Sequence, residues 1–367
     1  MKYYIIAGEA SGDLYGALLI KHLRELDAEA EFRFWGGDAM QAEGGEPVKH
    51  IRELAIMGFV EVVAHLGTVL GNLRFCRQDI AAYQPDVVIG IDYPGFNLKI
   101  EAWAKQQGFH TAHYISPNLW AWKKGRIKGM RQSLDLLCHI LPFEQQFFAE
   151  NHLPQALYVG HPLIDVVEKE YPRPRALDGR PLIVLLPGSR KQELKHSLPL
   201  MASLANRHTE YQFIVAGMSL LGKEIYESLI PEESNLMVAF DMTYRLLSAA
   251  YAAVVCSGTA TLETALFDVP QVVCYRANPI SIAIAKTVVS RRIRYISLVN
   301  LIADKPIVAE LIQSEFNQER LEAEFSAITT DQANRRRMQA DYAAMRTLLG
   351  NEGASRRTAE AIINLLR

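Results

Sequence analysis

One segment near the middle of the chain has the residue types of an anion-binding loop. The five apolar residues Leu182 to Leu186 predict a buried strand, which Pro187 and Gly188 end before a helix that Ser189 can cap. Backbone N–H groups at a helix start and the Arg190 guanidinium both suit phosphate oxygens. Ser189 and Glu193 lie four residues apart, so they do not form a strict capping box. An ordinary strand-to-helix turn with a surface arginine fits these residues equally well.

A second candidate for phosphate binding follows the predicted strand 252–256. Small residues and hydroxyls gather there at a helix start, where N–H groups and Oγ atoms can hold a diphosphate. Glu263, about two turns further on, has the chemistry to accept hydrogen bonds from ribose hydroxyls. The alternative is that the hydroxyls only cap the helix and that Glu263 makes a surface pair. The residues of this segment are Ser257, Gly258, Thr259, Ala260 and Thr261.

A carboxylate ends another predicted strand, 85–92. Asp92 would lie at the carboxyl end of a parallel strand, where α/β sheets place their ligands. A turn or helix-capping role is the alternative, because Asp is common before Pro-Gly. His110 and His113 follow on the strand 110–116, but residues three apart on a strand point to opposite faces, which excludes them as a metal pair.

The chain begins with the same strand, glycine turn and helix arrangement. A strand over 3–7 leads through Gly8, Glu9, Ser11 and Gly12 into a helix over about 14–26, which Ser11 or Asp13 could cap. The spacing is not GxGxxG, so a dinucleotide fingerprint is absent. The chain has no DxD pair, the motif that would indicate a metal-chelated diphosphate. We therefore expect neither a metal nor a cofactor.

These segments belong to two successive arrays of alternating strands and helices. The arrays predict an α/β protein with two Rossmann-like domains facing a cleft. The charged, proline-rich segment 168–181 marks the boundary, giving an N-terminal domain over 1–170, a C-terminal domain over 171–345 and a final helix over 346–367. We expect further strands at 32–35, 50–54, 136–141, 211–216, 236–239 and 271–275, and helices at 57–73, 244–250, 280–289, 317–347 and 353–366.

The composition is that of a soluble globular protein. Among 367 residues, 49% are hydrophobic and 22% are charged, and the net charge of −2 does not favour nucleic acid as a partner. Four widely spaced cysteines suit a reducing compartment and argue against a disulfide framework. The sequence has no signal-peptide pattern and no apolar run of about 18 residues, so we expect a cytoplasmic protein.

The predicted helix 57–73 carries an apolar stripe and almost no charge. A core helix is the simpler interpretation, and a surface that meets lipid is the alternative. A basic cluster later in the chain fits either a solvated helix face or a contact with anionic groups. The cluster comprises Lys123, Lys124, Arg126, Lys128 and Arg131, and the stripe comprises Phe59, Val62, Val63, Leu66, Leu70 and Leu73.

Over nearly all its length the chain resembles the lipid-A-disaccharide synthase family. Its members are two-domain (GT-B type) glycosyltransferases of Gram-negative bacteria. The resemblance implies transfer of 2,3-diacylglucosamine from its UDP ester to the 6-hydroxyl of 2,3-diacylglucosamine 1-phosphate (lipid X). The matching motifs are AGEASGD (7–13), MQAEG (40–44), ELAIMGFVEV (53–62), PDVVIGIDYPGFN (85–97), HYISPNLWAW (113–122), LPFE (141–144), GHP (160–162), LLPGSRKQE (185–193), SGTATLE (257–263) and SLVNLI (297–302).

The resemblance also implies roles for individual residues. Asp92 matches the general base, and Arg190 matches the arginine at the UDP diphosphate. Ser11 and Asn300 match polar residues that line the cleft, and the segment from Ser257 to Glu263 matches the UDP-binding segment. Many family members have a second aspartate where this chain has Gly95, so a carboxylate pair is not expected here.

The substrates of the family that the chain resembles are embedded in a membrane. The resemblance therefore favours lipid contact over a core position for the 57–73 stripe. The resemblance therefore implies peripheral association with the cytoplasmic side of the inner membrane. It also implies a homodimer with exchanged C-terminal elements.

Two alternative functions are another sugar-nucleotide enzyme of the same fold, such as a UDP-GlcNAc epimerase or a muramyl-type transferase, and a binding module without turnover. The second alternative would not need Asp92, because binding alone requires no base.

Overall fold

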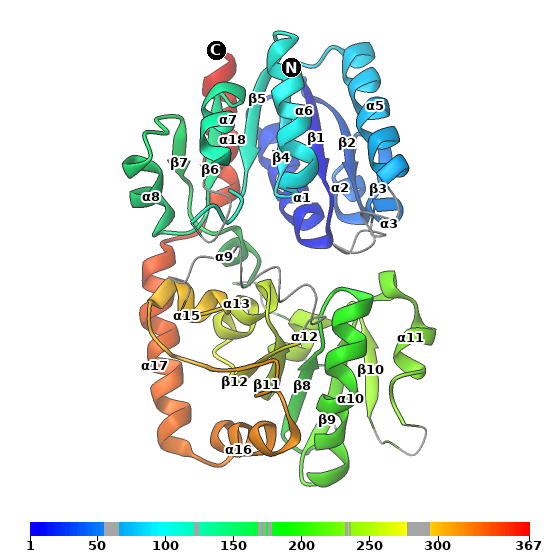
Figure 1. Cartoon of the computed structure of the whole chain (residues 1–367), viewed down its shortest axis with the longest axis vertical. Helices are drawn as coiled ribbons and strands as arrows, with labels where there is room; N and C mark the ends of the chain where they lie inside the picture. Colours follow the sequence, from blue (N-terminus) through cyan, green and yellow to red (C-terminus); the bar gives the residue numbers. More distant parts are fainter. Residues whose placement is uncertain are drawn as a thin grey trace. The chain divides into compact units, whose positions relative to one another are not determined.

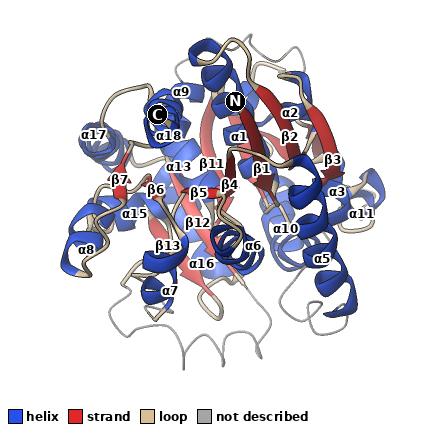
Figure 2. Ribbon diagram, turned by 90° about the horizontal axis from the view of Figure 1, so that it is seen from above, coloured by secondary structure: helices blue, strands red, loops and turns tan. Residues whose placement is uncertain are grey.

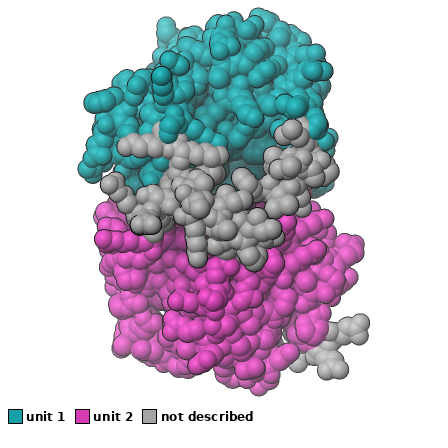
Figure 3. Space-filling model, viewed as in Figure 1, with its two compact units in different colours: residues 1–165, 350–367 teal, residues 166–349 magenta. Residues whose placement is uncertain are grey.

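The chain divides into two compact units. The computed structural model describes residues 1–54, 66–120, 125–167, 171, 174, 178–231, 234, 236–276 and 294–367. Unit 1 comprises Met1–Asp165 with Gly350–Arg367, and unit 2 comprises Val166–Leu349 (Figure 3). The helix expected at the end of the chain thus belongs to the same unit as the first strand.

Unit 1 is built on a seven-stranded parallel sheet with the order β3-β2-β1-β4-β5-β6-β7. Helices cover both faces: α1, α2 and α18 lie on one, and α5, α6 and α7 on the other (Figures 1 and 2). The strands are β1 Lys2–Ala7, β2 Glu31–Gly36, β3 Glu46–His50, β4 Val87–Ile91, β5 His110–Tyr114, β6 Leu136–His139 and β7 Ala156–Tyr158. The helices are α1 Ala10–Leu26, α2 Asp38–Ala42, α3 Ile51–Leu54, α5 Leu66–Tyr83, α6 Pro94–Gln106, α7 Arg126–Ser133, α8 Glu144–Glu150, α9 Pro162–Val167 and α18 Ala354–Leu366.

Unit 2 is built on a six-stranded parallel sheet, β10-β9-β8-β11-β12-β13, which repeats the order of the first six strands of unit 1. The strands are β8 Leu182–Leu186, β9 Gln212–Gly217, β10 Met237–Phe240, β11 Ala250–Cys256, β12 Gln271–Tyr275 and β13 Ala309–Ile312. The helices are α10 Lys191–Arg207, α11 Lys223–Glu227, α12 Thr243–Leu247, α13 Thr259–Leu266, α15 Leu298–Ala303, α16 Gln318–Thr329 and α17 Gln332–Leu349, with a short 3-10 turn at Ser219–Leu221. The two sheets confirm the predicted pair of Rossmann-like α/β domains.

Central strands follow the apolar runs of the sequence because both faces of each sheet are covered. All residues of β4 and β8 are buried, as the runs Val87–Ile91 and Leu182–Leu186 predict. Within the described residues, no helix combines the length and apolar content needed to cross a bilayer.

One predicted strand of unit 1 was wrong in position. The third strand of unit 1 spans Glu46–His50 rather than 50–54, and residues 51–54 form α3. Ile51 and Leu54 are both buried, which fits the three-residue spacing of a helix face. The strand itself contains Pro47, which an edge strand tolerates because one side of its backbone is unpaired.

The C-terminal helical region also differs from the prediction. The stretch 317–347 is two helices, because the Asp331 carboxylate accepts hydrogen bonds from the N–H groups of Ala333 (2.9 Å) and Asn334 (3.0 Å) and so caps a new helix. Strand β13 was not predicted from the sequence. The segment 280–289, expected to be helical, lies outside the described residues, as does 55–65.

Candidate active site

The first part of the site lies where the strand order of unit 1 reverses, between β1 and β4. In open α/β sheets this point, at the carboxyl ends of the strands, is where ligands bind. Asp92 directly follows β4 and is half-buried, with its N–H donating to the Tyr114 carbonyl at 2.9 Å. Glu9 follows β1, which pairs with β4 through Ala7 and Ile91, and is exposed. The structure thus brings Asp92 and Glu9 to neighbouring strand ends.

Asn97 of α6 holds this strand end together. Its buried Nδ2 donates to the carbonyl of Asp92 at 2.7 Å and to that of Ile6 at 3.2 Å, so one amide ties the loop to both strands. The Tyr93 ring covers Gly8, where a Cβ would lie 2.5 Å from the ring. Burial, with the charge of Glu9, raises the pKa of Tyr93 to about 12, so the hydroxyl stays protonated.

The expected caps of the first helix have other roles. Helix α1 begins at Ala10, so Ser11 and Asp13 lie inside it and neither caps it. Because the Asp13 side chain reaches the neighbouring strand end, its carboxylate instead accepts hydrogen bonds from Gly37 N–H (2.6 Å) and Met40 N–H (3.1 Å) at the start of α2. Ser11 is half-buried in the first turn.

The corresponding point in unit 2 lies between β8 and β11 and carries the segment around Arg190. Gly188 has a φ of +116°, and Glu193 packs against it. The Glu193 carboxylate accepts hydrogen bonds from the N–H groups of Ser189 (3.0 Å) and Arg190 (3.2 Å). Helix α10 is therefore capped from Glu193, three residues after its N-cap Arg190, and the prediction that Ser189 caps it was wrong. Arg190 itself is exposed.

Arg190 and Glu193 lie beside the ends of β11 and β12. A Cβ on Gly188 would be 3.4 Å from Cys256 Sγ, which places the two loops in contact. Burial and the Glu193 charge raise the pKa of Cys256 to about 12. At the end of β12, burial and the Glu193 charge raise the pKa of Tyr275, whereas the Arg190 charge lowers it. Arg190 is therefore close enough to the ends of β11 and β12 to act on both residues electrostatically.

The segment 257–261 combines exposed and buried residues. Gly258 and Thr259 are exposed at the start of α13, so their N–H groups are open to an anion. Ser257 is tied down by an Oγ hydrogen bond to the Ile296 carbonyl at 3.1 Å. Thr261 is buried and donates to the Gly258 carbonyl at 2.8 Å, which gives it a structural role, and Ala260 is half-buried.

Glu263 lies one α13 turn below this helix start. Burial raises its pKa to about 7, although a hydrogen bond from the Tyr244 hydroxyl at 3.3 Å opposes the shift. Tyr244 belongs to an aromatic group with Phe267 and Tyr171, whose ring centroids lie 5.8 and 5.7 Å from its own. A carboxyl group poised near neutral pH can accept or share a proton with a hydroxyl ligand.

Asn300 does not present its amide to a ligand in this structure. The side chain is buried, its Nδ2 donates to the Val308 carbonyl and to Glu310, both at 2.9 Å, and its Oδ1 accepts from Ile307 and Val308 N–H. All four hydrogen-bonding positions of the amide are occupied. The residue holds the loop before β13, and the substrate contact predicted for it stays a prediction.

Both sheets therefore present chemical groups at the same topological point, with a carboxylate in unit 1 and a cation with a helix start in unit 2. A family model of lipid-A-disaccharide synthetase matches residues 3–364. The chain belongs to the lipid-A-disaccharide synthase family. Membership makes the protein a glycosyltransferase of lipid A biosynthesis.

Curated members of the lipid-A-disaccharide synthase family match along the whole chain. The enzyme of Geobacter metallireducens is 35% identical over 373 residues, covering 99% of this chain and 96% of its own length. That of Chromohalobacter salexigens is 36% identical over 379 residues, covering 100% and 97%. Both carry the name lipid-A-disaccharide synthase.

Solved structures share the fold at low identity. UDP-GlcNAc 2-epimerase from Neisseria meningitidis, bound to UDP-GlcNAc, has a TM-score of 0.68 at 12% identity and covers 99% of this chain and 100% of its own. The glycotransferase of kitacinnamycin has a TM-score of 0.64 at 15% identity and covers 100% and 99%. These likenesses place the family member among GT-B folds and say nothing about its reaction.

The residues of the stripe predicted to contact lipid differ in their exposure where the structure describes them. Phe59, Val62 and Val63 and the side chain of Leu66 lie outside the described residues. Leu70 is 57% exposed, whereas Leu73 is only 6% exposed and belongs to the core beside Cys76 and Ile80. Leu73 is therefore a core residue and not a lipid contact, because its face of α5 packs on the sheet.

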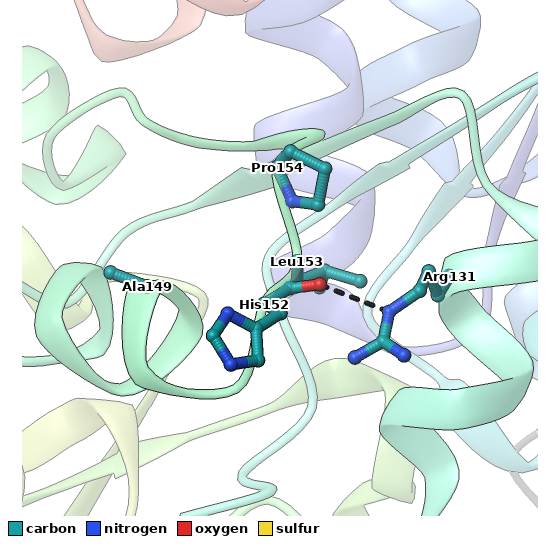
Figure 4. Close-up of a pocket in the computed structure, with 5 residues that line it drawn as sticks. All are labelled: Arg131, Ala149, His152, Leu153 and Pro154. Carbon is teal, nitrogen blue, oxygen red and sulfur yellow. Dashed lines mark hydrogen bonds between the residues drawn. The ribbon is translucent and has the colours of Figure 1, made fainter.

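A surface pocket of about 540 Å³ lies away from the strand ends that carry the site. Figure 4 shows Arg131 of α7 pointing to the His152 carbonyl, which it contacts at 2.9 Å. Pro154 precedes β7, so the pocket opens at the amino-terminal edge of the sheet, opposite the edge with Asp92. The basic cluster is represented there by Arg131, while Lys123 and Lys124 lie outside the described residues. The pocket is lined by Arg131, Ala149, His152, Leu153 and Pro154.

Sequence reasoning missed several side chains that shape the site of this family member. Asn97, Glu101 and Tyr93 were not predicted to have a role, and Glu193 was considered only as a cap partner at the wrong spacing. One signal was present in the sequence: Gly90 interrupts an otherwise β-branched strand, which indicates a close approach by another group. That group is the side chain of Glu101.

Proposed function

We propose that the protein transfers 2,3-diacylglucosamine from UDP to the 6-hydroxyl of 2,3-diacylglucosamine 1-phosphate (lipid X). The products are the β(1→6) disaccharide 1-phosphate and UDP. The observation that carries the proposal is the pairing of chemistry at the two switch points, a carboxylate after β4 and an arginine with a helix start after β8 and β11. Membership of the lipid-A-disaccharide synthase family supports the choice of substrates.

Asp92 acts as the general base in this proposal. Its carboxylate takes the proton of the acceptor 6-hydroxyl as that oxygen bonds to the anomeric carbon of the donor. The bond from the anomeric carbon to the UDP oxygen breaks at the same time, on the opposite face, so the configuration inverts. One carboxylate is sufficient because attack is direct and forms no covalent intermediate with the protein.

Groups of unit 2 stabilise the leaving UDP in this proposal. The Arg190 guanidinium and the N–H groups of Gly258 and Thr259 offset the charge that develops on the diphosphate, a role that needs no metal ion. Gly188, Ser189 and Ser257 shape this phosphate site, and Glu263 accepts hydrogen bonds from the ribose. On the acceptor side, Glu9 and Ser11 contact the sugar.

Product formation tests the reaction directly. The purified protein is incubated with UDP-diacylglucosamine and lipid X, and the lipid fraction is analysed by mass spectrometry for the disaccharide 1-phosphate. We expect disaccharide and UDP in equal amounts, also after treatment with a metal chelator. Donor consumption without disaccharide, or epimerised donor sugar, would refute the proposal.

We also propose that the protein associates peripherally with the cytoplasmic face of the inner membrane, where both acylated substrates reside. Exposed Leu70, together with Phe59, Val62, Val63 and Leu66 of the same segment, would enter the lipid surface, and basic residues such as Lys128 would attract anionic head groups. Replacing Leu70 by Ser should weaken co-sedimentation with anionic vesicles while the thermal unfolding temperature stays unchanged. Equal co-sedimentation of the variant would contradict the proposed surface.

The homodimer implied by the family resemblance is tested by sedimentation velocity.

A further inference from the structure

Three polar side chains are buried together directly behind the strand end that carries Asp92. Asn97 and Glu101 come from α6 and His113 comes from β5, and each is 0% exposed. A buried carboxylate and imidazole are costly to remove from water unless they are paired, so such a cluster needs an explanation. Asn97 is explained by its hydrogen bonds to the strand ends, which leaves Glu101 and His113.

Glu101 and His113 form a close pair beneath β4. His113 Nδ1 lies 2.7 Å from Glu101 Oε1, and the sheet register places His113 beside Gly90. A Cβ on Gly90 would lie 2.2 Å from Glu101 Oε1 and 2.9 Å from Asn97 Cβ. The glycine thus leaves the space that the Glu101 carboxylate fills, two residues before Asp92.

Two carboxylates favour the protonated form of His113. Burial opposes protonation of His113, but the Glu101 carboxylate, and then that of Asp92, outweigh it and raise its pKa. Among the described residues, the carboxylates that raise the pKa of His113 come from α6 and from the end of β4. Its Nε2 has no hydrogen-bond partner among the described residues. Glu101 acts on His113 through the direct contact at Nδ1, whereas Asp92 acts through its charge.

A second buried histidine shows that burial alone gives the opposite result. His139 of the adjacent strand β6 is also buried, and its Nδ1 is 3.9 Å from Glu144. Desolvation lowers the pKa of His139 to about 4, so it is neutral at pH 7. The difference between the two histidines follows from the close Glu101 pair and from Asp92.

We propose that His113, fixed by Glu101, is protonated and acts as a positioning residue whose positive charge keeps Asp92 ionised. The inference rests on the proposed function, in which Asp92 is the base. Neither His113 nor Glu101 contacts a substrate; both act through Asp92. A buried pair that served only to stabilise the fold would change stability on mutation but would leave the titration of Asp92 unchanged.

The pH dependence of kcat/KM separates these roles. His113→Asn keeps a donor at the Nδ1 position for Glu101 but removes the positive charge. Loss of a nearby cation raises the pKa of a carboxylate, so the acid limb of the profile should move to higher pH by about one unit. Activity on the acid limb then falls about tenfold, while the plateau at high pH is largely retained. The matched variant His139→Asn should leave the profile in place. A profile for His113→Asn that superimposes on the wild type, or an equal shift in both variants, would overturn the proposal.

A second measurement does not depend on turnover. Selective ¹⁵N labelling of histidine allows each imidazole to be titrated by NMR, with the His113 signals assigned through bond connectivities in the wild-type protein. In the Asp92→Asn protein, the pKa of His113 should fall because one of its two carboxylates has lost its charge. An unchanged His113 titration would refute the coupling even if His113→Asn failed to fold. Coupling without disaccharide formation by the wild type would leave the pair intact and reject only the proposed reaction.

Discussion

Asp92 and Tyr93 are two consecutive residues with positive φ, +44° and +49°, at the end of β4. Non-glycine residues in this left-handed region cost about 1–2 kcal/mol each, so the surrounding structure must hold them there. The Asn97 amide binds the Asp92 carbonyl, and the Tyr93 ring stacks on Phe96 with centroids 5.6 Å apart. Backbone strain of this kind is often found at functional sites.

The proposed role of Asp92 as base predicts a specific kinetic defect. Asp92→Asn keeps the size and the left-handed preference of the residue but cannot accept the proton, so kcat should fall by about 10²–10⁴-fold. UDP affinity, measured by calorimetry, should stay within about twofold of the wild type because Arg190 and α13 are untouched. Asp241→Asn is a matched control, since Asp241 also follows a parallel strand with a positive φ of +55°. Retained turnover in Asp92→Asn would reject the assignment.

The raised pKa of Glu263 predicts a pH-dependent stability. The folded protein binds the Glu263 proton up to about pH 7, whereas the unfolded chain releases it near the ordinary value of 4.5. The folded state therefore binds more protons between these values, and stability falls as pH rises through this window. Glu263→Gln removes the ionisation, so it should be more stable than wild type by on the order of 2 kcal/mol at pH 8, with the difference vanishing toward pH 4.5. Urea denaturation of unit 2 at the two pH values checks this, and a pH-independent difference would contradict it.

At the level of elements, the start of α10 differs from an open anion-binding loop. The N–H groups of Ser189 and Arg190 already donate to the carboxylate of Glu193, which lies three residues after the N-cap Arg190. The exposed helix start of α13 has no such carboxylate bond to Gly258 or Thr259 among its described contacts. This division agrees with the proposed phosphate site, in which α13 supplies N–H groups and the α10 loop supplies the side chain of Arg190.

Loss of the α10 cap should be visible as a loss of stability. Glu193→Ala leaves two N–H groups at the helix start without their acceptor, and the free energy of unfolding should fall by about 1 kcal/mol. Gln192→Ala changes the exposed neighbouring residue, which makes no described hydrogen bond, and should change stability by less than about 0.5 kcal/mol. Equal stabilities of the two variants, measured by urea denaturation, would show that the cap is unimportant.

On the scale of the whole molecule, the last helix belongs to the first unit. Helix α18 packs on α1, and hydrogen bonds from the N–H groups of Gly353 and Ser355 to Asp165 fix its start. The Tyr114 and Ser355 hydroxyls lie 3.4 Å apart in the interior. Unit 1 is therefore completed only when the end of the chain is in place.

This arrangement predicts that damage to the C-terminus is felt at the N-terminus. Ile362→Ala removes a fully buried side chain from α18 and should destabilise unit 1 by about 2–5 kcal/mol. Hydrogen exchange followed by mass spectrometry should show lost protection in peptides of residues 1–165, with peptides of 178–349 much less affected. Asn364→Ala, at an exposed position of the same helix, is the control. Uniform loss of protection across both units would mean that they unfold as one.

The amino-acid sequence by itself determined the two α/β arrays and the strand ends that carry Asp92, Arg190 and the segment 257–259. Buried parallel strands are apolar runs, and the glycines and hydroxyls after them mark helix starts, so both features are local. The tertiary structure decided the rest: Leu73 is core, Asp13 caps α2, the amide of Asn300 is saturated, and Glu101 pairs with His113 behind Asp92. The physical reason is that burial and hydrogen bonding depend on the neighbour that folding brings to each side chain, and residue type and spacing do not specify that neighbour.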